Sequence, residues 1–403
     1  MNNSVYKSLR ISEIVQTISL THNFDKDKLI AINTSDVYNG VMGKGTLTPV
    51  EELKGQFKKT IQKDDILFSE IRPANRRFAI VTNSDCSDFV VSTKLMVLRK
   101  FNEDVDSSYF YYCLTNQPFL DILQRRAENR IGSFPQITYD LLANYAFPIP
   151  PLEEQKRISK IIANIDRKIE LNRQINDNLE AMAKQLYDYW FVQFDFPNEE
   201  GKPYKTSGGE MVWNEKLKRE IPKGWKSTTL GDECQMYQPK TLGLSELDES
   251  AIYKVYGANG VVGKYHAYNH ENSEIAMACR GNSCGTINRT APFSWITGNA
   301  MVIKMIDDSI HNEYIKQALR YANVNGAISG SGQPQLTREN LSSIKLCKPT
   351  RKLIMRFSEQ VSNIVEMYLQ NEANIEELTK QRDELLPLLM NGQATVNYHL
   401  SDD

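Results

Sequence analysis

The chain has 403 residues, of which 41% are hydrophobic and 24% charged, and its formal net charge is −2. These values are ordinary for a globular protein and, at this length, predict two or three domains. They exclude a purely electrostatic nucleic-acid binder but not one with a local basic surface. No segment approaches the ~20 apolar residues of a membrane span, the N-terminus lacks a signal-peptide core, and six scattered cysteines argue against a disulfide framework. We therefore expect a cytoplasmic protein that does not enter a membrane.

Residues 1–150 are expected to form a mixed α/β globule. Short runs rich in β-branched and aromatic residues alternate there with turn residues, which is the pattern of strands in a sheet. The runs lie at 65–68, 78–82 and 95–98, and short helices are expected at 107–115 and 119–126.

Residues 151–196 predict one long helix. Pro151 suits a first helical turn, and Glu153 and Glu154 follow where the helix dipole favours acids. No glycine or proline interrupts the segment before Pro197, so the helix has about 40 residues and is roughly 60 Å long. Apolar residues fall at heptad spacing, which predicts a coiled coil. One heptad series comprises Ile158, Ile165, Leu179 and Leu186, and the other comprises Ile161, Ile175, Met182 and Tyr189.

The second half of the chain repeats the first. Pro135, Gln136 and Thr138 recur 199 positions later as Pro334, Gln335 and Thr337, within similar glycine- and serine-containing loops. The same offset relates many apolar positions that follow. We therefore expect a pseudo-twofold tandem repeat of an α+β unit, in which each copy is a globule followed by a long helix. After the first helix we place a polar linker at 197–221, a second globule at 222–349, a second long helix at 350–392 and a tail at 393–403.

The repeat includes a polar position in the heptad pattern. Asn172 and Asn371 are related by the same offset, and each lies near the middle of its helix in the first series. A buried polar residue at such a site can set the register of a coiled coil. A solvated asparagine is the alternative, since neither helix needs to be fully buried.

Several polar residues recur at matching places and suit DNA, because arginine, asparagine and glutamine can bind base edges or phosphates. Such residues can equally be solvated or paired with acids. The candidates in the first copy are Lys44, Arg72, Arg76, Arg77 and Gln136, and those in the second are Lys264, Arg280, Asn282, Ser283, Arg289, Gln333 and Gln335.

Aromatic residues crowd the end of the first long helix. Such a cluster can be a surface for a partner protein or the place where the helix packs on its own globules, and the sequence leaves both open. The partner-binding candidates are Tyr187, Trp190, Phe191 and Phe194.

Signatures of catalysis and metal binding are missing from the sequence. The glycine-flanked Lys44 lacks the spacing and the hydroxyl residue of a phosphate-binding loop. Cys279 and Cys284 have no second cysteine pair that would complete a zinc site. We expect no catalytic residues, no metal site and no enzymatic activity in this chain.

Several motifs together resemble the specificity subunits of Type I restriction–modification systems. The run PLEEQKRI at 151–158 resembles the family's helix-opening signature, and IPKGW at 221–225 with Leu230-Gly231-Asp232 resembles the start of its second recognition domain. Asp64-Asp65-Ile66-Leu67 before the Arg72 loop and the connector 194–225 are also of the family type. The resemblance covers nearly the whole chain. One departure is Thr350-Arg351-Lys352-Leu353-Ile354, which replaces the helix-opening signature in the second copy.

The resemblance implies two target-recognition domains, each reading half of a bipartite asymmetric DNA site, and two long antiparallel helices that set the spacing. It implies a non-catalytic subunit that joins two modification subunits, which use S-adenosylmethionine, and restriction subunits driven by ATP and Mg. The chain itself would bind double-stranded DNA and no cofactor. The departure at residues 350–354 puts the equivalence of the two partner-binding surfaces in doubt. The alternatives are a self-contained restriction or modification enzyme with fused recognition domains, and a coiled-coil adaptor that binds only proteins.

Overall fold

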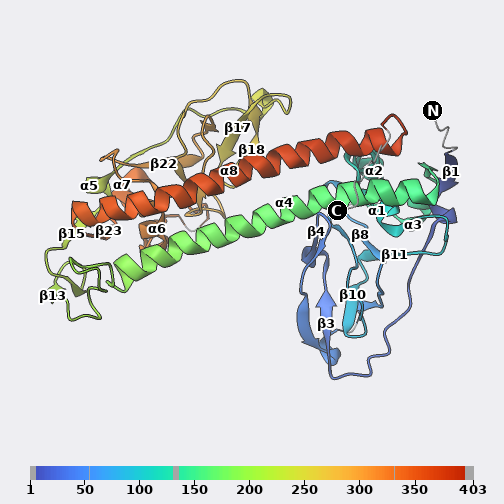
Figure 1. Ribbon diagram of the computed structural model, residues 1–403, viewed down its shortest axis with the longest axis horizontal. Helices are drawn as coiled ribbons and strands as arrows, with labels where there is room; N and C mark the ends of the chain where they lie inside the picture. Colours follow the sequence, from blue (N-terminus) through green and yellow to red (C-terminus); the bar gives the residue numbers. More distant parts are fainter. Residues whose placement is uncertain (1–5, 54, 130–135, 331, 395–403) are drawn as a thin grey trace. The chain divides into compact units, whose positions relative to one another are not determined.

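The computed structural model describes residues 6–53, 55–129, 136–330 and 332–394. The chain forms two compact units: unit 1 is Met1–Glu170 with Ile375–Asp403, and unit 2 is Leu171–Asn374. Each unit therefore contains one globule and a part of both long helices, α4 (Leu152–Tyr187) and α8 (Arg351–Met390), which are labelled in Figure 1. Residues 132–135 and 331 of the repeated loops, and most of the tail expected at 393–403, lie outside the described residues.

Unit 1 places its strands in two four-stranded sheets and two small pairs. The sheet orders are β2-β11-β8-β9 and β6-β3-β10-β7, with the pairs β1-β12 and β4-β5. Its strands are β1 (Lys7–Arg10), β2 (Val15–Thr17), β3 (Lys28–Ile32), β4 (Val37–Tyr38), β5 (Val41–Met42), β6 (Thr46–Pro49), β7 (Phe57–Lys59), β8 (Ile66–Ser69), β9 (Phe78–Ile80), β10 (Phe89–Ser92), β11 (Leu95–Lys100) and β12 (Ala146–Ile149). Its short helices are η1 (Ile11–Glu13), η2 (Thr34–Asp36), η3 (Val50–Glu52), η4 (Pro73–Asn75), α1 (Ser107–Thr115), α2 (Gln117–Glu128) and α3 (Tyr139–Ala143).

Unit 2 repeats the sheet β2-β11-β8-β9 and the pair β1-β12, but its second sheet has three strands, and it has a separate pair, β13-β14. Its main sheet has the order β16-β22-β19-β20, a second sheet has the order β18-β17-β21, and β15 pairs with β23 as β1 pairs with β12. Its strands are β13 (Met211–Asn214), β14 (Arg219–Pro222), β15 (Lys226–Thr229), β16 (Cys234–Tyr237), β17 (Tyr253–Gly257), β18 (Gly260–Tyr265), β19 (Ile275–Ala278), β20 (Ile287–Arg289), β21 (Trp295–Ile296), β22 (Ala300–Met305) and β23 (Lys345–Lys348). Its short helices are α5 (Leu230–Glu233), η6 (Leu244–Glu246), α6 (Glu313–Tyr321), η7 (Asn325–Ala327) and α7 (Arg338–Ser342), and a π-helical turn, η5 (Asp188–Val192), follows α4.

The elements predicted in the first globule are confirmed. The expected strands correspond to β8, β9 and β11, and the helices to α1 and α2. Local chemistry explains where the helices begin. Asp106 accepts a hydrogen bond from the backbone N–H of Tyr109 at the start of α1, and Asn116 accepts one from Phe119 at the start of α2. Pro118 is the second residue of α2, and proline is tolerated in the first turn of a helix.

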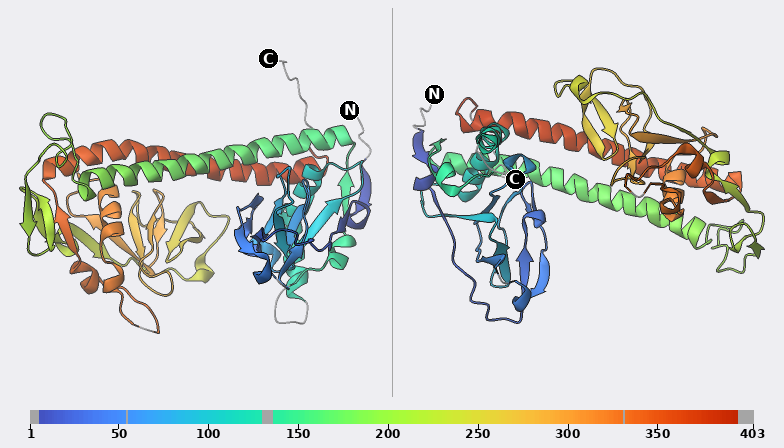
Figure 2. Two further views of the ribbon diagram at one scale, coloured as in Figure 1. Left: turned by 90° about the horizontal axis from the view of Figure 1, so that it is seen from below. Right: turned by 180° about the vertical axis from the view of Figure 1, so that it is seen from behind.

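The two long helices pair antiparallel. In unit 1, Asp166 of α4 accepts a hydrogen bond from Arg382 of α8 at 2.9 Å. In unit 2, Asn176 of α4 donates to Glu372 of α8 at 2.8 Å. The second contact lies ten residues further along α4 and ten residues back along α8, as antiparallel pairing requires. Figure 2 shows both helices from two further sides.

One predicted heptad series is wrong. Ile175 and Met182 of α4 and Tyr189 of η5 are exposed, and Ile161 is half-buried. The buried series lies one residue later; it contains Ile162, Ile169, Asn176, Ala183 and Trp190. An amphipathic stripe can combine the first series with residues either three or four positions away. The buried series contains the polar Asn176 and the small Ala183, so hydrophobicity alone favoured the exposed series.

The polar contact in the helix pair also differs from the expectation. Asn172 and Asn371 are half-buried, and the asparagine that makes an interhelical hydrogen bond is Asn176 instead. Asn176 is buried, and its amide nitrogen reaches a charged acceptor across the pair. A buried polar contact of this kind favours one register, because a shift would leave the amide nitrogen without its acceptor.

Candidate nucleic-acid interface

In unit 1 the candidate residues meet at one edge of the main sheet, β2-β11-β8-β9. This edge is the place where β8 ends and β9 begins. The repeated loop is joined to this edge: the backbone N–H of Ile137 donates to the carbonyl of Glu70 at 2.7 Å, and Gln136 forms a β-bridge with Ile71. The Gln136 side-chain amide also donates to the Glu70 carboxylate at 2.9 Å. Gln136 thus holds two loops together, and its side chain is already hydrogen-bonded within this chain.

The loop between β8 and β9 carries the three arginines. Arg72 and Arg76 both have left-handed backbone conformations, with φ of 46° and 52°. Non-glycine residues adopt this conformation at a cost, and such strain clusters at functional sites. The Arg72 side chain is exposed, whereas Arg76 and Arg77 are half-buried.

Arg76 and Arg77 point back into the protein. Arg76 donates to the side chains of Asn39 and Gln117, and Arg77 donates to the carbonyls of Ser35 and Val37. These bonds organise the neighbouring β4–β5 hairpin. Arg76 and Arg77 therefore hold the hairpin in place, whereas the Arg72 side chain is exposed on the surface.

Two exposed lysines lie near this edge. Lys44 follows the β4–β5 hairpin, as the sequence indicated, and Lys94 lies in the turn between β10 and β11, where its carbonyl accepts a hydrogen bond from Glu70. Sequence reasoning missed Lys94. The position of Lys94 at this edge follows only from the sheet order, which places the start of β11 beside the end of β8.

Unit 2 presents the corresponding edge with the same construction. The backbone N–H of Leu336 donates to the carbonyl of Cys279 at 3.0 Å, and Gln335 forms a β-bridge with Arg280. The side chains of Arg280, Asn282, Gln333 and Gln335 are exposed here, and Ser283 is half-buried. The repeated sequence thus encodes the same loop-to-loop junction twice.

The junctions also correct two details of the repeat. The β-bridges make Arg280 the counterpart of Ile71, so Arg72 corresponds to Gly281 and the two arginines are one position out of step. Lys264 lies within strand β18, opposite Lys254 and half-buried, whereas Lys44 lies in a loop. The similar sequences around Lys44 and Lys264 therefore adopt different local structures.

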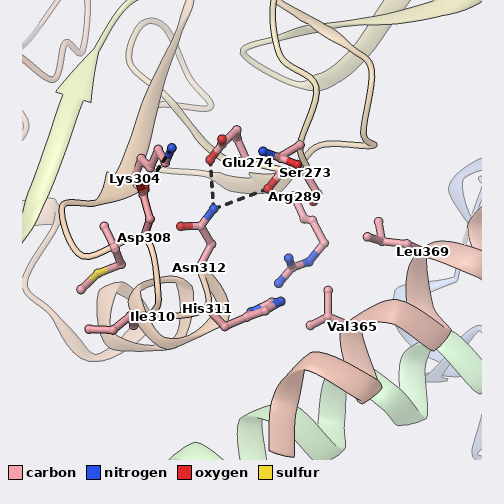
Figure 3. Close-up of a pocket in the computed structure, with 12 residues that line it drawn as sticks. Ser273, Glu274, Arg289, Lys304, Asp308, Ile310, His311, Asn312, Val365 and Leu369 are labelled. Carbon is pink, nitrogen blue, oxygen red and sulfur yellow. Dashed lines mark hydrogen bonds and ion pairs between the residues drawn. The ribbon is translucent and has the colours of Figure 1, made fainter. Parts of the chain in front are cut away.

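Arg289 is not available to DNA, and that prediction is wrong. Its side chain is 4% exposed and forms an ion pair with Glu313, which is 1% exposed. Figure 3 shows the guanidinium directed toward His311 and toward Val365 and Leu369 of α8, at a cavity of about 500 Å³. Alternation along β20 turns this side chain inward, and a buried carboxylate compensates its charge.

The ion pair belongs to a buried network that joins α6 to α4 within unit 2. Lys316 contacts both Glu180 and Glu313, and Arg320 donates to Glu180 at 3.1 Å. Burial lowers the pKa of Arg289 to about 10, and burial together with the charge of Arg289 lowers the pKa of Lys316 to about 8. Both groups therefore remain mostly protonated at neutral pH, which suits their acidic partners.

The partner-binding candidates at the end of α4 are also corrected. Tyr187, Trp190, Phe191 and Phe194 are buried in the core of unit 2. Phe191 packs against Tyr314 of α6, Trp225 and Phe357 of α8, with ring centroids 5.1–6.0 Å apart. The cluster closes the globule onto both helices. Composition could not separate this from a docking surface, because both favour large aromatic side chains.

The described part of the chain contains neither a cluster of metal-ligating side chains nor a membrane-spanning helix. Across those residues, His, Cys, Asp and Glu side chains do not gather in groups of three or more that could hold a metal ion. Among the same residues, no helix is both long and apolar enough to cross a membrane.

The fold therefore defines a tandem-duplicated α+β protein built on a pair of long antiparallel helices, with the same loop junction in each copy. The family model described as "Type I restriction modification DNA specificity domain" matches residues 6–181 and 222–377. The chain belongs to this family of specificity subunits, and both matched ranges extend into the long helices.

Related proteins agree with this assignment. The chain is 29% identical to the Type I restriction enzyme HindI specificity subunit of Haemophilus influenzae, covering 97% of this chain and 100% of that protein. It is 25% identical to the MjaIX specificity subunit of Methanocaldococcus jannaschii, covering 73% of this chain and 70% of that one. The crystal structure of a Type I restriction–modification S subunit from M. genitalium has a similar fold, with a TM-score of 0.56, 18% identity and 97% of each chain covered.

Proposed function

We propose that this chain is the non-catalytic DNA-reading subunit of a Type I restriction–modification complex. Each unit would read one half of a bipartite asymmetric target in double-stranded DNA. The observation that carries the proposal is the duplicated junction, in which Gln136 and Gln335 bridge to the loops that follow β8 and β19. Two similar but diverged edges in one chain suit two different half-targets.

The chemistry of the exposed residues supports DNA as the ligand. Lys44, Arg72 and Lys94 supply positive charge at the unit 1 edge, and Arg280, with the amides of Asn282 and Gln333, lies at that of unit 2. Cations bind phosphates, and arginine and amide side chains read base edges. A local surface of this kind is compatible with a net charge of −2.

We further propose that methylation and cleavage reside in partner subunits. Two modification subunits would use S-adenosylmethionine, and restriction subunits would use ATP and Mg, while this chain binds none of these. The exposed residues of the long helices offer surfaces for such partners, among them Ile175 and Met182 of α4. We also propose a cytoplasmic location, where the DNA target is found.

The test is to map methylated adenines genome-wide in cells that express the modification subunit with and without this chain. We expect a bipartite motif that depends on the chain. Exchange of residues 1–150 for the first domain of another family member should then change one half of that motif only. A motif independent of the chain, or methylation by the chain alone, would contradict the proposal.

A further inference from the structure

The β4–β5 hairpin of unit 1 ends in a rigid two-residue turn. Tyr38 pairs with Val41, and the turn between them is Asn39-Gly40, both with positive φ, at 45° and 96°. Asn-Gly is the preferred sequence for such a turn, because its twist matches that of the flanking strands. A Cβ on Gly40 would lie 2.8 Å from the Tyr111 hydroxyl oxygen, so the tip is also closely backed by α1.

The hairpin tip exposes an apolar pair instead of burying it. Tyr38 is 56% exposed and Val41 is 52% exposed, whereas Val37 on the other face is fully buried. Single exposed apolar residues are common and need no explanation. Here, however, the two side chains lie directly opposite each other on one face of a two-stranded element, and the protein holds that element in place.

The arginines of the neighbouring loop do the holding. The backbone N–H groups of Asn39 and Gly40 donate to the carbonyls of Arg76 and Phe78 at 2.7 and 2.9 Å. The Arg76 guanidinium donates to the Asn39 side chain at 3.1 Å, and that of Arg77 stacks over the Tyr38 ring at 5.4 Å. The tip is thus fixed to the same strained loop that projects Arg72.

We infer that Val41 reads DNA by contact with the 5-methyl group of a thymine in the half-site bound by unit 1. The inference rests on the proposed DNA-binding function. A valine side chain has no hydrogen-bonding group, and the thymine methyl is the apolar feature that base edges offer in the major groove. Tyr38, held by Arg77, forms the second wall of the contact, and the exposed Arg72 and Lys44, on the loops that adjoin the hairpin, would bind the flanking phosphates.

The second unit carries a related feature. Asn259-Gly260-Val261 repeats the letters of Asn39-Gly40-Val41, and Val261 is 51% exposed. The register differs, because Gly257 pairs with Gly260 and the turn there is Ala258-Asn259. An exposed valine after an Asn-Gly pair is therefore shared by the copies, although the two tips present it differently.

The experiment removes the methyl group from the DNA and the valine from the protein. The complex of this chain with its modification subunit is titrated onto a duplex that carries the mapped target, with each thymine replaced in turn by uracil. We expect one thymine in one half-site whose replacement weakens binding by roughly fourfold, as for one buried methyl-sized group. Val41→Ala should weaken binding to the thymine duplex by a similar factor and lose the response to uracil at that position.

Two matched variants complete the design. Phe101→Ala removes an apolar side chain that is 50% exposed just after β11, at the end of the sheet β2-β11-β8-β9 away from Lys94, and should keep both the affinity and the uracil response. Val41→Thr keeps the shape of the side chain and guards against a folding defect; it should give an intermediate response. A full uracil response in Val41→Ala, or no response at any thymine in the unsubstituted complex, would overturn the inference. Failure of that complex to prefer its target over an unrelated duplex would instead refute the proposed function.

Discussion

The two units share a topology but attach to the long helices by different chemistry. In unit 1 the globule meets α4 and α8 through apolar residues and a few hydrogen bonds. Asp166 accepts hydrogen bonds from Tyr112 and Arg382, both at 2.9 Å, and the Gln155 side chain is bonded to the backbone of Asp104 and Asp106. In unit 2 a larger aromatic cluster is joined by a buried ion network around Glu313 and Glu180. Strand order thus survives divergence better than the contacts that fix a globule to its helices, because many side-chain sets can fill the same interface.

This difference has an energetic consequence. Apolar contacts tolerate the loss of one partner in proportion to the area lost, whereas a buried ion pair does not, since the remaining charge stays desolvated. Unit 2 should therefore respond more steeply to single substitutions and to pH. All four tryptophans lie in unit 2, at positions 190, 213, 225 and 295, so tryptophan fluorescence reports the unfolding of that unit alone.

The largest effect is expected at the aromatic cluster of unit 2. Trp190→Ala should lower the free energy of unfolding by about 3–5 kcal/mol, because it leaves a cavity in a packed core. Tyr189→Ala, at the exposed neighbouring position, should cost less than about 1 kcal/mol. Urea unfolding followed by the remaining tryptophans measures both. Equal small effects would mean that the cluster is a surface and that the contrast between the units is false.

A comparable loss is expected when the ion network is broken. Glu313→Ala strands the buried Arg289 and should lower the free energy of unfolding of unit 2 by about 3–5 kcal/mol. In unit 1, Asp166→Ala should cost only about 1–2 kcal/mol, because Asp166 is partly exposed. Amide hydrogen exchange in α1 and α6 reports the two units separately. If Asp166→Ala proved the more damaging, the comparison would have to be reversed.

Acid should destabilise unit 2 through His311. Burial, with the nearby charge of Arg289, lowers the pKa of His311 to about 4, below its ordinary 6.5. The folded state therefore binds fewer protons than the unfolded state between these values. The stability of unit 2 is greatest above pH 6.5 and falls with decreasing pH, by at most about 1.4 kcal/mol per pH unit from this group.

The control for the pH prediction is His311→Asn. The histidine Nδ1 accepts a hydrogen bond from the backbone N–H of Glu313, and an asparagine side chain can accept a similar local bond. Fluorescence-detected unfolding at pH 4.5 to 7.5 should show a shallower pH dependence in the variant. The same slope in both proteins would remove His311 as the cause.

The smallest effects compare the two edges that we propose to bind DNA. Arg72→Ala and Arg280→Ala should each weaken binding without unfolding either unit, since both side chains are exposed. A lost phosphate contact would reduce the salt dependence of binding by about one unit, and a lost base contact would relax one position at ~1–3 kcal/mol. Lys63→Ala, exposed before β8 at the other end of the sheet, is the control. Unchanged binding in either arginine variant would remove that loop from the interface.

Several features were determined by the sequence alone. The offset of 199 residues located the loops that carry Gln136 and Gln335, and the same offset relates α3 to α7 and β12 to β23. The absence of glycine and proline before Pro197 predicted an uninterrupted helix, and α4 with its π-helical turn spans Leu152 to Val192. These features are local or periodic, so they are visible in short windows of sequence.

The tertiary structure decided which side chains face outward. Arginine and tryptophan are residue types common in binding sites, yet Arg289 and Trp190 are both buried. Strand β20 turns Arg289 toward α6, and the pairing of α4 with α8 encloses Trp190. Arg76 and Gln136 were expected on the surface and serve instead to fix loops. The choice between Met182 and Ala183 for the helix seam likewise depended on a partner about 200 residues away. Burial is set by contacts between segments distant in sequence, and residue type constrains those contacts only weakly.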